Sequence, residues 1–165
     1  MIDITPLLSE NVKKHFLTLP ASHQKEWVNY VNEAKKEETR LKRVLKMQMS
    51  FCEKYTLEGE PQVINLLEQI SCVSTQEGNA LAEAFINTIG NNHSGVYCMA
   101  YKWAIAFLVQ LYKNSEPSSL RAIAIYGILN DLYYFEPIEE QAVNADNTTI
   151  KEEIKQLLAP FADKN

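Results

Sequence analysis

The chain has 165 residues, of which 46% are apolar and 22% are charged, and its formal net charge is −5. This length and balance are typical of a globular protein with enough core to fold without disulfides or a structural metal. The three cysteines, Cys52, Cys72 and Cys98, are odd in number and form no CxxC pair, which argues against a disulfide framework and a thiolate zinc site.

Apolar residues recur with the 3.6-residue period of an α-helix along most of the chain, and the alternation typical of strands is not sustained. A first helix is predicted over 9–19, because Ser9 is a strong N-cap and Pro20 is a stop signal. A second helix is predicted over 22–36 and a third over 38–55, each with an apolar stripe. The first third of the chain therefore predicts three amphipathic helices joined by short turns.

The segment 56–61, which contains a glycine and a proline, is the clearest break in the helical pattern. Residues 1–55 hold ten Lys/Arg against seven Asp/Glu, whereas residues 56–165 hold six against fourteen. This asymmetry indicates two surfaces with different partners, two halves that attract each other, or simply differently solvated faces. We predict a basic helical unit over 1–57 and an acidic helical bundle over 58–165, packed as one compact body.

Further helices are predicted in the second half, over 61–71, 74–89, 96–112, 120–135 and from 149 onward. The segments 96–112 and 120–135 are the most apolar of the chain, so we expect a buried hairpin surrounded by the amphipathic helices. Lys102 and Asp131 interrupt these segments, which argues against a membrane hairpin. The sequence thus predicts an all-α bundle of about seven to nine helices around a central apolar hairpin.

The expected compartment follows from the cysteines and from the first residues. Cysteines embedded in apolar runs are typical of small core residues in a reducing environment. Residues 1–7 lack the basic region and the apolar stretch of a signal peptide. We therefore expect a soluble, cytoplasmic protein without membrane association.

Known patterns of catalytic chemistry are missing from the sequence. The histidines, His15, His23 and His93, show no HExxH or ExxH spacing, and there is no GxSxG elbow or glycine-rich phosphate loop. We therefore predict no catalytic residue, no metal site and no cofactor. The sequence indicates a protein that is not an enzyme.

Tyrosine and tryptophan crowd the two most apolar segments, where their polar tips could line a pocket between helices. The members of this hypothetical ligand pocket are Tyr101, Trp103, Tyr126, Asp131 and Tyr134. Ordinary core packing is the alternative. In that interpretation Asp131, a carboxylate on an apolar helix, needs a buried partner, which Lys102 or Arg121 could supply.

A run of basic residues spans the turn before the third helix and the first half of that helix. Three of them, Lys36, Arg40 and Arg43, share one helical face at spacings of i, i+4 and i+7. This ridge could bind phosphates or an acidic partner. Alternatively, its cations pair with the interleaved glutamates or with the acidic second half.

The same region combines an aromatic helix with Ala-Lys-Lys and Glu-Thr-Arg elements: Phe16-x-x-Leu19-x-x-Ser22-His23-x-x-x-Trp27-Val28-x-x-Val31-x-x-Ala34-Lys35-Lys36-x-Glu38-Thr39-Arg40-x-x-Arg43. Over roughly residues 7–55 the chain resembles the helical C-terminal motif of the bacteriocin-protection family, also called YdeI or OmpD-associated. The resemblance implies a protective or stress-associated role, carries over no catalytic residue, and singles out Thr39, Arg40 and Arg43. Residues 56–165 resemble no family that we can name.

These three motif positions also have a local, structural interpretation. Thr39 can cap the third helix. Arg40 and Arg43 can reach Glu33 or Glu37 across the preceding turn.

Together these features predict a non-enzymatic bacterial interaction protein, protective or regulatory. It would use Lys36, Thr39, Arg40 and Arg43, or the acidic second half, to bind another protein or a second copy of itself. One alternative is a small-ligand-binding helical sensor that uses the aromatic pocket. A second alternative is nucleic-acid binding through the basic third helix, which the acidic pI of about 5.3 disfavours.

Overall fold

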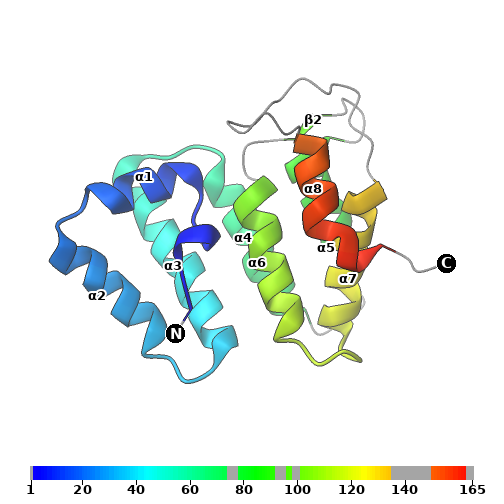
Figure 1. Ribbon diagram of the computed structural model, residues 1–165, viewed down its shortest axis with the longest axis horizontal. Helices are drawn as coiled ribbons and strands as arrows, with labels where there is room; N and C mark the ends of the chain where they lie inside the picture. Colours follow the sequence, from blue (N-terminus) through cyan, green and yellow to red (C-terminus); the bar gives the residue numbers. More distant parts are fainter. Residues whose placement is uncertain (1, 74–77, 92–95, 98–100, 135–149, 163–165) are drawn as a thin grey trace.

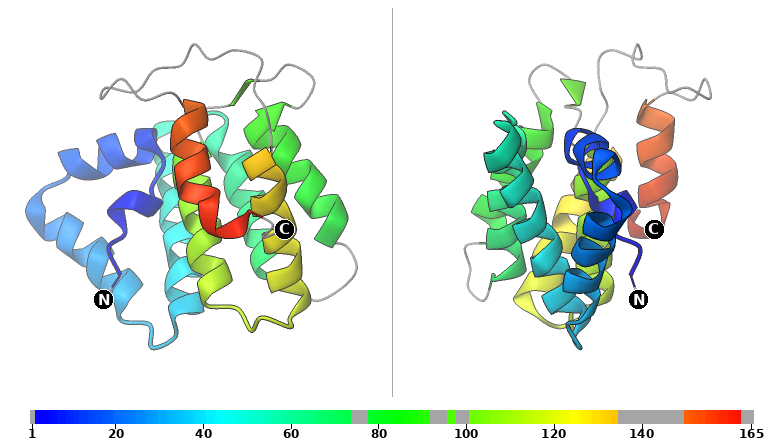
Figure 2. Two further views of the ribbon diagram at one scale, coloured as in Figure 1. Left: turned by 45° about the vertical axis from the view of Figure 1, so that its right-hand side comes forward. Right: turned by 90° about the vertical axis from the view of Figure 1, so that its left-hand side faces the viewer.

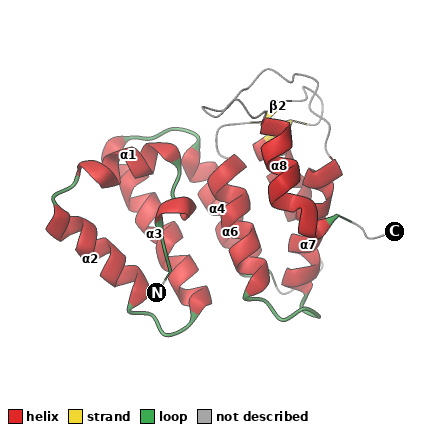
Figure 3. Cartoon of the chain, viewed as in Figure 1, coloured by secondary structure: helices red, strands yellow, loops and turns green. Residues whose placement is uncertain are grey.

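The computed structural model describes residues 2–73, 78–91, 96–97, 101–134 and 150–162. These residues form eight α-helices, two short 3-10 helices and one pair of two-residue strands (Figures 1 and 3). The predicted all-α bundle of seven to nine helices is confirmed.

The first part of the chain contains η1 (Thr5–Leu7), α1 (Glu10–Thr18), α2 (Ala21–Asn32) and α3 (Glu37–Tyr55). Ser9 caps α1 as predicted, because its Oγ accepts a hydrogen bond of 3.2 Å from the backbone N–H of Val12. Figure 1 shows α1 and α2 at one end of the molecule, with α3 between them and the remaining helices. The long helix α3, which packs against α4, joins this end to the rest of the fold together with η1, which packs against α6.

The second part contains α4 (Glu60–Ser71), α5 (Gly78–Ile89), α6 (Tyr101–Lys113), α7 (Leu120–Tyr134), α8 (Ile150–Leu158) and η2 (Ala159–Phe161). Between α5 and α6, β1 (Gly90–Asn91) pairs antiparallel with β2 (Val96–Tyr97). Val96 and Tyr97, which the sequence predicted to be helical, are therefore strand residues, and α6 is described from Tyr101. Figure 2 shows α8 and α5 on opposite sides of α7, which contacts both.

The turn between α3 and α4 lies at the predicted break over residues 56–61 and contains two residues with positive φ. Thr56 ends α3 with a left-handed backbone at φ 52°, and Leu57 N–H donates to the Cys52 carbonyl at 3.0 Å. Gly59 precedes α4 at φ 86°, a conformation that favours glycine. Pro61 lies in the first turn of α4, where the missing N–H costs no helical hydrogen bond.

One hydrophobic cluster extends across this turn. It includes Leu45 of α3, Leu67 of α4, Leu108 of α6 and Ile128 of α7, each no more than 2% exposed. Burial of this many apolar side chains is the main source of the fold's stability. The division at residues 57 and 58 stays a prediction, and the core of the molecule does not stop there.

The predicted apolar hairpin consists of α6 and α7, which pack against each other. On α7 the side chains of Leu120, Ile123 and Tyr134 are 46%, 59% and 51% exposed. None of the helices in the described ranges combines the length and apolar character that a bilayer crossing requires.

Candidate functional site

The basic ridge begins in the turn between α2 and α3. Because α3 starts at Glu37, Lys36 occupies the N-cap position and Thr39 lies within the first turn. The prediction that Thr39 caps the helix is therefore wrong. Lys36 and Thr39 are both exposed.

Arg40 holds the turn between α2 and α3 together. Its Nε donates to the Ala34 carbonyl at 2.8 Å, and its Nη1 donates to Glu37 Oε2 at 2.9 Å. The predicted contact between Arg40 and Glu37 is confirmed. The guanidinium thus satisfies a backbone acceptor in the turn and neutralises an acidic side chain in the first turn of α3.

Arg43 connects α3 to the last turn of α2. Its Nη1 donates to the Tyr30 carbonyl, and the guanidinium carbon lies 4.9 Å from the centroid of the Tyr30 ring. Carbonyls in the last turn of a helix lack a helical partner, and a cation above an aromatic ring adds an electrostatic attraction. The two arginines of the ridge are therefore half-buried links between α2 and α3.

The acidic member of the motif, Glu38, links the two parts of the chain. It pairs with Arg121 of α7 at 3.1 Å and with Lys42 at 3.3 Å. Arg121 also donates to Ser115 Oγ at 2.9 Å and to the Ser71 carbonyl at 3.0 Å. Burial alone would raise the pKa of the Glu38 carboxyl, but the hydrogen bonds and charges of Arg121 and Lys42 outweigh burial and lower it.

The predicted buried pair of Asp131 with Lys102 or Arg121 is wrong. Asp131 is exposed, Arg121 binds Glu38, and Lys102 pairs with Glu153 at 2.9 Å. The helix α7 is apolar on almost every side, so its sequence pattern did not reveal which face meets solvent.

The described members of the predicted aromatic pocket lie in different surroundings. Trp103 is buried at 2% exposure, whereas Asp131 and Tyr134 are exposed. Tyr126 is half-buried and packs against Tyr112 and Phe161. The side chain of Tyr101 lies outside the described residues, although Tyr101 is the first residue of α6.

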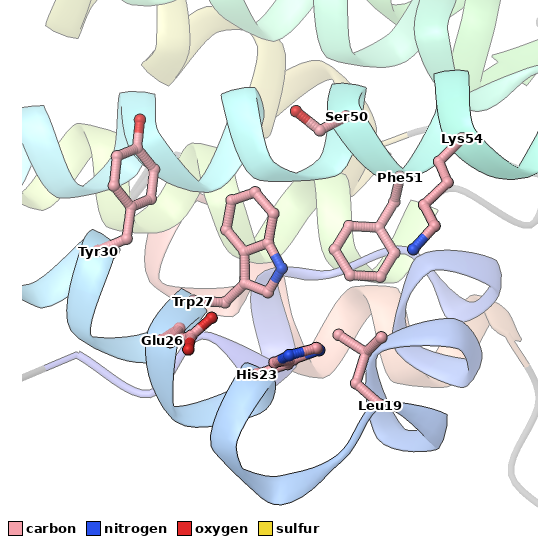
Figure 4. A pocket seen from close by; sticks show the side chains of 8 residues that line it. All are labelled: Leu19, His23, Glu26, Trp27, Tyr30, Ser50, Phe51 and Lys54. Carbon is pink, nitrogen blue, oxygen red and sulfur yellow. The ribbon is translucent and has the colours of Figure 1, made fainter.

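An open groove of about 400 Å³ lies between α2 and α3 (Figure 4). Four aromatic or aliphatic side chains line it: Leu19, Trp27, Tyr30 and Phe51. Four polar side chains complete the lining: His23, Glu26, Ser50 and Lys54. Figure 4 shows the Trp27 ring between the two helices. The helical spacing of these aromatic residues predicts apolar helix faces but gives no sign that they border a groove.

The aromatic rings of the groove belong to a longer row that connects α1, α2 and α3. The centroid of Trp27 lies 5.8 Å from that of Tyr30 and 5.8 Å from that of Phe51. Phe51 lies 5.8 Å from Tyr55, whose ring stacks on His15 at 3.9 Å. Aromatic pairs at these separations stabilise one another beyond their buried area, so the groove has preformed walls.

The described cysteines have no role in this groove. Cys52 is buried, and burial together with the nearby carboxylates of Glu60 and Glu53 raises the pKa of its thiol to about 11. A thiol with that pKa is protonated at neutral pH and is a poor nucleophile. Cys72 is exposed, which contradicts its expected core position, while Cys98 and His93 lie outside the described residues.

The part of the chain that the structure describes holds no group of three or more His, Cys, Asp or Glu residues placed to bind a metal ion.

Residues 6–49 match the family model described as bacteriocin-protection, YdeI or OmpD-associated. The predicted family resemblance is thereby confirmed over these residues, and the remainder of the chain is unrecognised. No curated protein and no solved structure matches the chain. The matched segment runs from η1 into α3 and contains both arginine links and the α2 side of the groove.

Proposed function

We propose that this chain is a non-enzymatic interaction protein that binds a protein partner through the groove between α2 and α3. The observation that carries the proposal is the position of Trp27 and Tyr30, which are half-buried and line the groove. Tryptophan and tyrosine dominate the binding energy of many protein interfaces. The groove belongs largely to the family-matched segment, which supports a bacterial protective context for the interaction.

The lining of the groove defines the chemistry of the partner. Its walls are aromatic and aliphatic, and its polar side chains include one acidic residue, Glu26, and one basic residue, Lys54. A volume of about 400 Å³ accommodates a few side chains rather than a whole helix. The partner we propose therefore inserts one large apolar side chain, such as leucine, methionine or phenylalanine, from a segment of mixed charge.

Arg40 and Arg43 hold α2 and α3, the two helices that form the groove, in place before any partner binds. Arg43 contacts the backbone carbonyl and the ring of Tyr30, and Arg40 binds the turn between α2 and α3. A preformed site loses less conformational entropy on binding than a flexible one. In this proposal the ridge shapes the binding surface. A phosphate or nucleic acid would have to displace the Ala34 carbonyl and the Glu37 carboxylate from Arg40, and the Tyr30 carbonyl from Arg43.

Ser50→Arg tests the proposal, since it places a long charged side chain in the groove from the half-buried position of Ser50. Ser118→Arg, at an exposed position between α6 and α7, is the matched control. We expect the partner recovered from native cells to bind purified Ser50→Arg at least tenfold more weakly in Kd and Ser118→Arg normally. Unchanged binding by Ser50→Arg, together with lost binding by Lys36→Glu, would instead assign the interaction to the ridge.

The non-enzymatic part of the proposal has its own test. We expect a broad screen of hydrolase and transferase substrates to give no turnover that scales with protein concentration. A reproducible turnover that disappears when a buried polar side chain is changed, as in Glu60→Gln, would contradict it.

A further inference from the structure

The two walls of the groove between α2 and α3 carry opposite charges. Glu26 of α2 and Lys54 of α3 both line the groove, and both side chains are exposed. Figure 4 shows Glu26 extending from α2 and Lys54 from α3, with the Trp27 ring between the two helices. The sequence neighbours of opposite charge, Lys25 and Glu53, do not line the groove. A segment that enters the groove therefore meets a negative charge on one helix and a positive charge on the other.

The two charges flank the rings against which an apolar side chain would pack. Glu26 directly precedes Trp27 in α2, and Lys54 is three residues after Phe51 in α3, a spacing that makes them neighbours on the helix surface. The centroids of the Trp27 and Phe51 rings are 5.8 Å apart, and the two rings are tilted by 54°. An apolar anchor that packs against these rings consequently has Glu26 on its α2 side and Lys54 on its α3 side.

Neither charge is neutralised by another residue of the described ranges. Within those ranges, Glu26 and Lys54 take part in no ion pair. The Lys54 ammonium lies 5.1 Å from the centroid of the Tyr55 ring, a contact that leaves N–H donors able to bind a carboxylate. In contrast, Arg40 of the ridge already pairs with Glu37. The two groove charges are thus available to a partner.

Exposed charges at the rim of an interface contribute more to the choice of a partner than to its affinity. A like charge placed against one of them is repelled, and this repulsion disfavours wrong partners. We infer, resting on the protein-binding role proposed above, that Glu26 and Lys54 select the partner by its charge order. The partner segment carries a basic residue on one side of its apolar anchor, which pairs with Glu26, and an acidic residue on the other side, which pairs with Lys54.

Peptide selection on the full chain tests this charge order. A random dodecapeptide library displayed on phage is selected against the wild-type chain, Glu26→Lys and Lys54→Glu. We expect the wild-type chain to enrich peptides in which leucine, methionine or phenylalanine lies between a basic and an acidic residue. Glu26→Lys should shift the enriched peptides toward acidic residues on both sides of the anchor, and Lys54→Glu toward basic residues on both sides.

Matched controls change the net charge by the same amounts away from the groove. They are Lys113→Glu, at the exposed end of α6, and Glu116→Lys, at an exposed position in the following turn, and both should enrich the same peptides as the wild-type chain. In fluorescence anisotropy, the peptide that the wild-type chain enriches most should bind both controls normally. It should bind Glu26→Lys and Lys54→Glu about three- to tenfold more weakly. Equal Kd values for the wild-type chain and both groove variants would overturn the inference.

Ser50→Arg separates this inference from the protein-binding role itself. If partners bind in the groove, Ser50→Arg should enrich none of the peptides that the wild-type chain enriches. Enrichment that Ser50→Arg abolishes, but with charges in random order around the anchor, supports the groove and overturns the charge selection. Absence of enrichment on the wild-type chain, or enrichment that Ser50→Arg leaves unchanged, overturns both.

Discussion

Replacing Arg43 by methionine should destabilise the protein by about 2 kcal/mol, because the link between α3 and α2 disappears while the apolar stem is kept. The hydrogen bond from the guanidinium to the Tyr30 carbonyl contributes about 1.5 kcal/mol at a half-buried site, at the lower end for a charged donor. The cation above the Tyr30 ring at 4.9 Å adds about 0.5–1 kcal/mol. Lysine at this position should recover part of the loss, since it keeps the charge but not the planar fork.

Urea denaturation followed by circular dichroism measures this loss, with Lys46→Met as the matched control. Lys46 is exposed on the same helix, one turn after Lys42, so its replacement should change the free energy of unfolding by less than about 0.5 kcal/mol. For a chain of this size a loss of 2 kcal/mol corresponds to a fall in Tm of about 4–8 °C. Equal stability of Arg43→Met and Lys46→Met would refute a structural role for Arg43. The Arg43 guanidinium would then again be a candidate for binding a partner.

Three further changes test the packing around this unit. Gln48→Leu should cost about 2–4 kcal/mol in urea denaturation, because the fully buried Gln48 accepts from Ser9 N–H at 2.8 Å and donates to the Leu7 carbonyl at 3.1 Å; a cost below 1 kcal/mol would contradict this. Glu38→Gln should lower the free energy of unfolding by up to about 1 kcal/mol above pH 4.5, because only the ionised carboxylate gains from Arg121 and Lys42; the loss stays small because the Glu38 side chain is 37% exposed. Unfolding curves measured over a pH series should show the difference between the variant and the wild-type chain vanish as the pH falls through the lowered pKa of Glu38. Gly127→Ala should raise stability by about 0.5–1 kcal/mol in thermal unfolding, because a Cβ at this exposed position of α7 meets nothing within 4 Å.

Helix positions were predictable because their signals are local. Ser9 marks the start of α1 and Pro20 its end, and Gly59 and Pro61 mark the turn before α4. Each of these residues acts through its own backbone geometry or through a neighbour a few residues away. At the start of α3 the capping signal of Thr39 was misleading, because the helix begins at Glu37 and its N-cap residue, Lys36, makes no side-chain capping bond.

Side-chain partners were not predictable in the same way. Arg121 is six residues from Ser115 but 83 from Glu38, and the sequence offered Asp131 as a nearer carboxylate. Which acid it meets depends on how α7 packs against the earlier helices, and a uniformly apolar helix gives no periodic signal of that orientation. The strand pair before α6 has the same origin, since Val96 and Tyr97 pair with Asn91 and Gly90, a backbone contact that the helical pattern of the sequence did not indicate.

The groove was missed for a related reason. Trp27, Tyr30 and Phe51 recur at helical spacing, which predicts only that they face another helix. Whether such residues close into a core or leave an open groove depends on the angle between α2 and α3. That angle depends on the turn that Arg40 fixes and on the Arg43 link, which are contacts between side chains and backbone carbonyls.

The distribution of contacts within the family-matched segment bears on where its function lies. Arg40, Arg43 and Glu38 each have a partner inside the chain, and two of these partners are backbone carbonyls that any sequence would supply. These three residues hold the helical unit in shape, whereas Leu19, His23 and Trp27, which belong to the same motif, line the groove. The motif therefore combines residues that fix α2 against α3 with residues that border the groove, and replacing the exposed His23 should weaken the proposed interaction while changing stability by less than about 0.5 kcal/mol.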